Sequence, residues 1–74
     1  MENDVIDRLQ IWVVYNSPID LPGRYVARKW ILDQPTAELV QGKTLEEVRE
    51  KLPQGLKMLP RDLSDDPIIV ESWV

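Results

Sequence analysis

The segment at residues 44–53 most constrains the fold, because it contains the start, the buried face and the end of one short helix. Thr44 can cap the helix, and Glu47, three residues later, can reach back to the backbone N–H of Thr44. Pro53 cannot continue the helical ladder, and Gly55 suits the left-handed conformation that closes helices. We therefore predict a helix at residues 44–52 with an apolar face made by Leu45, Val48 and Leu52.

Three other segments are rich in β-branched and aromatic residues and predict strands. The link between the first two is rich in turn-forming residues, which favours an antiparallel hairpin. The last strand runs to the final residue of the sequence. The predicted strands are residues 9–16, 24–33 and 68–74.

The expected product is one small α+β domain over residues 1–74, with residues 1–8 as a loose N-terminal arm. Its sheet is three-stranded and mainly antiparallel, with one short helix packed on one face, in the order strand, strand, helix, strand. Residues 34–40 and 56–60 are ambiguous, and one of them could supply a short fourth strand.

Composition excludes several classes of protein. The chain has 74 residues and no cysteine, so it can be neither a disulfide scaffold nor a thiolate enzyme. Its acidic N-terminus and its lack of a long apolar run predict a cytoplasmic protein with no membrane partner. Thirteen acidic and nine basic residues give a net charge of -4, which disfavours nucleic-acid binding. A local basic stripe could still meet RNA or an acidic partner, but the solvated side and edge of a strand is the favoured explanation of its residues, Arg24, Arg28 and Lys29.

No catalytic constellation is visible. The chain has no histidine, which excludes a serine–histidine site, and its three glycines are too far apart for a phosphate cradle. Asp62, Asp65 and Asp66 could hold a hard cation, but ordinary turn chemistry explains them. Helix capping and favourable interaction with the helix dipole are enough to explain the acidic residues on the predicted helix without a catalytic role. We therefore expect no enzyme, no metal, no cofactor and no small-molecule ligand.

The predicted strands carry apolar residues on both faces, because side chains alternate along each strand. One short helix can cover only one face. The other face is the hypothesised interaction surface, which meets another protein or a second copy of the chain. The alternative is that it is core, covered by Leu39, Val40, Leu56, Met58 and Leu59. The residues assigned to the interaction surface are Trp12, Arg28, Trp30, Glu71 and Trp73.

Two resemblances bear on function. Residues 11–16, 25–30, 59–62 and 66–73 resemble a family of small uncharacterised bacterial proteins, a domain of unknown function. This resemblance implies a bacterial or phage origin. Residues 25–27 and 42–48, a strand followed by Gly-Lys-Thr-Leu-Glu-Glu-Val, are similar to HicB-like antitoxins. That similarity implies a regulator that binds and blocks a small RNA-cleaving toxin.

The sequence thus predicts a non-enzymatic protein–protein interaction module, with a homodimer as its simplest form. The alternative is a HicB-like antitoxin-type regulator.

Overall fold

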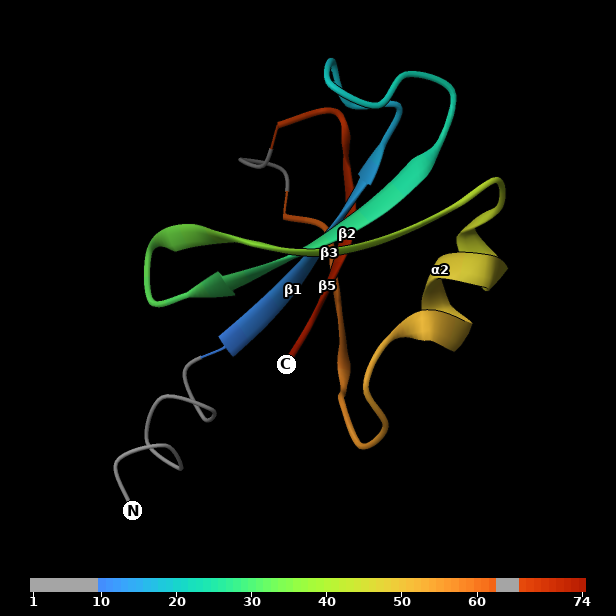
Figure 1. The fold of residues 1–74 in the computed structure, drawn as a ribbon. Helices are drawn as coiled ribbons and strands as arrows, with labels where there is room; N and C mark the ends of the chain where they lie inside the picture. Colours follow the sequence, from blue (N-terminus) through green and yellow to red (C-terminus); the bar gives the residue numbers. More distant parts are fainter. Residues whose placement is uncertain (1–9, 63–65) are drawn as a thin grey trace.

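In the part of the chain that the structure describes, the fold is a five-stranded sheet with one helix on one face (Figure 1). The structure, a computed structural model, describes residues 10–62 and 66–74, so the predicted arm at residues 1–8 lies outside the described residues. The strand order is β3-β2-β1-β5-β4, and every neighbouring pair is antiparallel. The strands are β1 (Gln10–Asn16), β2 (Tyr25–Ile31), β3 (Gln34–Gly42), β4 (Met58–Pro60) and β5 (Ile69–Trp73), and the helix is α2 (Leu45–Lys51).

The predicted sheet of three or four strands is wrong, and so is the order strand, strand, helix, strand. The chain runs β1, β2, β3, α2, β4, β5. Residues 34–42 form a full strand because Leu32 and Asp33 make a two-residue turn that returns the chain along β2. Pro35 is tolerated there because β3 is an edge strand. The predicted helix, the three predicted strands and the antiparallel pairing are confirmed, but the second strand is Tyr25–Ile31 and the last is Ile69–Trp73, each shorter than predicted.

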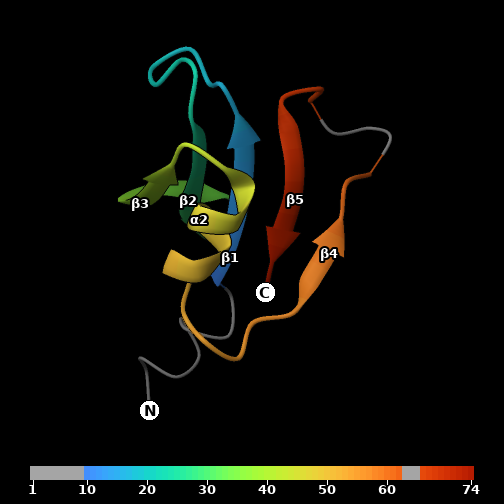
Figure 2. The ribbon, with the colours of Figure 1, turned by 90° about the vertical axis from the view of Figure 1, so that its right-hand side faces the viewer.

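The other strand in a segment that the sequence left ambiguous, β4, is three residues long and exposed. It pairs with β5, and a reciprocal pair of backbone hydrogen bonds between Lys57 and Val74 extends the ladder. Figure 2 shows α2 in front of β1 and β2, with β5 and β4 to its right. The strand β4 therefore depends on its pairing with β5, since its own side chains bury little.

The helix begins and ends where the sequence predicts. The hydroxyl of Thr44 accepts a hydrogen bond from the backbone N–H of Glu47 at 3.2 Å. The carboxylate of Glu47 accepts from the N–H of Lys43 at 3.0 Å, one residue before the predicted donor. Leu52 is the C-cap, and its N–H donates to the carbonyl of Arg49. The capping box therefore satisfies two backbone donors, one in the first turn and one just before the N-cap.

Gly42 is required by this cap. A Cβ at position 42 would lie 2.7 Å from Cβ of Glu47 and 3.3 Å from the carbonyl oxygen of Thr44. We expect Gly42→Ala to lower the free energy of unfolding by about 1–2 kcal/mol, because backbone and cap must shift apart. Thermal unfolding followed by circular dichroism measures the effect, with Gln41→Ala as the neighbouring control. Equal melting temperatures for the two variants would contradict this explanation.

The core lies between the sheet and α2. The central side chains of this core are at most 7% exposed, and further apolar side chains from β2, β3, β5 and the α2–β4 connection pack around them. Val40 and Leu56, which the sequence offered as a cover for the second face, pack against this core instead. The buried apolar residues of the cluster are Trp12, Val14, Ala27, Val48 and Leu52.

Helix α2 has seven residues, and no helix in the described part of the chain is long and apolar enough to cross a membrane.

Candidate interaction surface

Strand register assigns each side chain to one face of the sheet, because directly opposite residues of antiparallel strands share a face. Val14 lies opposite Ala27 on β2 and opposite Glu71 on β5. Val14 and Ala27 are core residues, so this row points toward α2. Trp12 lies opposite Trp73, in the next row of the same face. Glu71 and both of these tryptophans therefore lie on the helix side.

The hypothesised five-residue surface is not one surface. Trp30 lies opposite Ile11, and Arg28 lies opposite Val13, so both belong to the face away from α2. The alternation within β1 and within β2 was predicted correctly. The grouping of Trp12 with Trp30 was wrong, because only the register of the hairpin decides which sets face the same way.

A bulge in β5 produced a second error. Tyr15 pairs with Ile69 and Val14 with Glu71, which leaves Val70 as an extra residue. Ile69 and Trp73, which simple alternation places together, therefore lie on opposite faces.

Glu71 connects the sheet to the helix. It is 4% exposed, and its carboxylate accepts two hydrogen bonds from Arg49, at 2.9 Å and 2.6 Å. The indole N–H of Trp73 donates a third at 2.7 Å. Hydrogen bonding from Arg49, against the opposing effect of burial, lowers the pKa of Glu71 below its ordinary value. Glu71, assigned by the sequence to the interaction surface, therefore has a structural role: its carboxylate joins β5 to α2.

The basic cluster is divided between the two faces. Arg28, on the face away from α2, lies 3.5 Å from the carboxylate of Asp20 and donates to the carbonyl of Thr36 at 2.8 Å. Lys29 lies opposite Trp12, on the helix side, and lies 3.4 Å from the carboxylate of Glu38. The two cations therefore do not form one continuous basic stripe.

The face away from α2, here called the helix-free face, is mostly apolar. Its residues follow from the registers of all four strand pairs and form three rows across the sheet. Most are half-buried, and Val26 is 2% exposed because the β1–β2 loop, with a buried Pro18, folds over one end of the face. The rows are Pro35, Trp30 and Ile11; Leu39, Arg28, Val13, Ser72 and Leu59; and Gln41, Val26, Tyr15 and Ile69.

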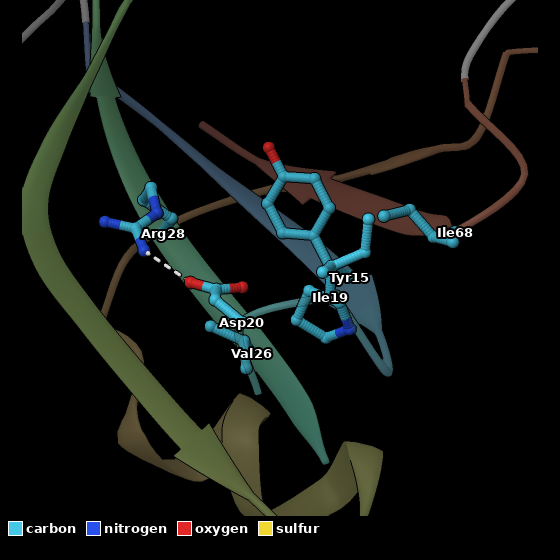
Figure 3. A pocket seen from close by; sticks show the side chains of 7 residues that line it. Tyr15, Ile19, Asp20, Val26, Arg28 and Ile68 are labelled. Carbon is cyan, nitrogen blue, oxygen red and sulfur yellow. Dashed lines mark ion pairs between the residues drawn. The ribbon is translucent and has the colours of Figure 1, made fainter. Parts of the chain in front are cut away.

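Two hollows lie on this face, with Tyr15 between them. The first has a volume of about 240 Å³, and Figure 3 shows the paired Arg28 and Asp20 on one side of it and Tyr15 and Ile68 on the other. The second has a volume of about 210 Å³ and is lined by apolar side chains and Tyr15. The hydroxyl of Tyr15 accepts a hydrogen bond from the indole N–H of Trp30 at 3.2 Å. This bond fixes the side chains that separate the hollows.

Two exposed apolar residues border the hollows. Ile19 lines the first hollow and is 99% exposed, and Leu32 lines the second and is 63% exposed. Leu32 also has a φ of 57°, a left-handed conformation that glycine normally takes at the first position of a two-residue hairpin turn. Neither residue was among the predicted site residues: Leu32 was placed inside the predicted strand 24–33, and Ile19 lies in the link between the first two strands.

Several backbone groups of the edge strand β3 cannot pair with another strand. Pro35 lacks an N–H, the carbonyl of Thr36 accepts from Arg28, and the carbonyl of Gln41 accepts from Lys51 at 2.6 Å. Proline and charged side chains are common protections of exposed sheet edges. The face of the sheet is therefore a better candidate for binding than this edge.

Acidic residues make no metal centre in the described ranges, where no three of them gather. Asp66 instead shapes a turn: its carboxylate accepts from the N–H of Ile68 at 3.1 Å, and its carbonyl accepts from the N–H of Ile69. Asp65 lies outside the described residues.

No family model, no curated protein and no solved structure matches this chain.

Proposed function

We propose that this chain is a non-enzymatic interaction module that binds another protein through the helix-free face. The main support is that the sheet has a second apolar face, whose side chains are not part of the core between the sheet and α2. Contiguous apolar surface at a solvent boundary is typical of protein interfaces. The exposed Ile19 and Leu32 extend that surface beyond the strands.

Charge supports a partner of largely apolar character. Arg28 is the one charged side chain in the three rows defined above, and Asp20 lies beside it. A partner therefore need not supply a counter-charge to bury this face. The centres of protein interfaces are depleted in charge and rich in aromatic residues. Tyr15 and Trp30 give the helix-free face the same character.

Site-specific photo-crosslinking in cells tests this proposal. A photoreactive phenylalanine at Leu32 probes the helix-free face, and the same residue at Met58, which is 46% exposed and opposite Trp73, is the matched control on the helix side. We expect discrete adducts from position 32 and few from position 58. Equal labelling from both positions, or none from position 32, would contradict the proposal.

A second candidate, an antitoxin-type regulator, is favoured by the chain order around the helix. Strand β3 ends at Gly42, and the capped helix begins directly after Thr44, which accords with the strand-then-helix motif of HicB-like antitoxins. This candidate predicts that a neighbouring gene encodes a small basic ribonuclease and that the purified chain blocks its RNA cleavage. If the ribonuclease cleaves RNA at the same rate with the chain in excess over it, this candidate function is excluded.

A further inference from the structure

We infer that the occupant of the helix-free face is a second copy of this chain, in a two-fold symmetric face-to-face dimer. This inference rests on the proposed function, because it names the partner of the same surface. In such a dimer the same patch is used twice, so the patch must be complementary to itself. Shape, charge and area each bear on this requirement.

The shape of the face meets it. The face carries two hollows, of about 240 Å³ and 210 Å³, and an exposed apolar side chain beside each of them. Ile19 and Leu32 of one copy thus supply protruding groups, and the hollows of the other copy receive them. By the two-fold symmetry each contact occurs twice.

The charge distribution permits a second copy. The chain has a net charge of -4, so two copies repel each other at long range. Part of the acidic charge, at Glu46, Glu47 and Glu50, lies on and beside α2, on the other side of the sheet (Figure 1). Arg28 is neutralised within each copy by Asp20. The helix-free face therefore lets two acidic copies meet without burying an unpaired charge.

The area approaches what a stable dimer needs. Strands about 4.8 Å apart and a rise of about 3.3 Å per residue give a five-stranded sheet of this length a flat area of roughly 500 Å². The relief of the side chains and the flanking loops with Ile19 and Leu32 add to it. Standard interfaces bury about 800 Å² of accessible surface per partner. A dimer through this face is therefore at the small end of standard interfaces.

A substitution at Leu32 tests the dimer best, because it can remove an interface side chain without destabilising the fold. Its φ of 57° suits glycine, so Leu32→Gly relieves the turn while it removes the exposed side chain. Solution mass by light scattering over a dilution series measures the dimer. We expect the wild-type chain to be a dimer at micromolar concentration, and we expect Leu32→Gly to weaken dimerisation about tenfold or more without a lower melting temperature for the monomer.

Met58→Ser, on the helix side, is the control and should leave the dimer dissociation constant within about twofold, as a residue outside the interface does. A wild-type chain that stays monomeric at several hundred micromolar overturns the inference. Leu32→Gly that dimerises as strongly as the wild type overturns it too. If the chain is monomeric yet position 32 crosslinks to a different protein, the second copy is excluded while the proposed function stands. Crosslinking that does not distinguish position 32 from position 58 defeats the proposed function itself.

Discussion

Replacing Trp12 with alanine is expected to lower the free energy of unfolding by about 3–5 kcal/mol and to leave the chain close to unfolded. Trp12 is 5% exposed and belongs to the core cluster with Val48 and Leu52 of the helical segment. A domain of 74 residues has a total stability of roughly 4–11 kcal/mol. Loss of one large buried side chain therefore removes a large part of that stability.

Urea unfolding of Trp12→Ala and Trp30→Ala measures the contrast between the two tryptophans. Trp30 is half-buried on the helix-free face, so its substitution should cost about 1–2 kcal/mol. The indole nitrogen of Trp12 is buried with no hydrogen-bond partner among the described residues, so Trp12→Phe should retain most of the stability. Equal losses for Trp12→Ala and Trp30→Ala would contradict the division of the faces.

Replacing Glu71 with alanine is expected to lower the free energy of unfolding by about 2–3 kcal/mol. The substitution removes the acceptor of three hydrogen bonds and leaves the donors of Arg49 and Trp73 without it. The side chain of Arg49 is 41% exposed and can turn to water, so the larger penalties of fully buried ion pairs do not apply. Glu38→Ala is the matched control, because Glu38 pairs with Lys29 but its side chain is 66% exposed. That control should cost less than about 1 kcal/mol.

The same carboxylate makes stability depend on pH. The pKa of Glu71 in the folded chain lies below its ordinary value of 4.5, chiefly because Arg49 donates hydrogen bonds to the charged form. The unfolded chain therefore binds this proton first as pH falls. The contribution of Glu71 is fully present well above pH 4.5 and is lost as pH falls from there through the lower folded pKa.

Urea unfolding at neutral pH and at several values below pH 4.5 checks this dependence. Glu71→Gln keeps the shape of the side chain but cannot ionise, so the stability difference between wild type and variant should shrink on acidification. A difference that stays constant down to the acid end of the series would show that Glu71 does not titrate as described.

The parts of the fold that local signals determine were predictable. The helix carries its own cap and stop, and the first two strands are dense in β-branched and aromatic residues. Strand β3 begins with Gln34 and Pro35, and β4 has three residues ending in Pro60, so neither has strong propensity. Both form because a neighbouring strand offers a ladder, which is a tertiary effect.

The candidate surface was predicted only in part. Two apolar faces follow from alternation alone, and Trp30 does lie on the helix-free face. The partition of the tryptophans depends on the register of β1 with β2 and on the pairing of β5 with β1, where a bulge leaves Val70 as an extra residue. Alternation within one strand contains no information about either.

One face of the sheet is core, and we propose that the other binds a second copy of the chain. The indole N–H signals of the three tryptophans, followed by heteronuclear NMR over a dilution series and assigned with Trp30→Phe, distinguish the two faces. The structure predicts that the Trp30 signal shifts with concentration while those of Trp12 and Trp73, on the helix side, stay fixed. Movement of the Trp12 and Trp73 signals with a stationary Trp30 would contradict it.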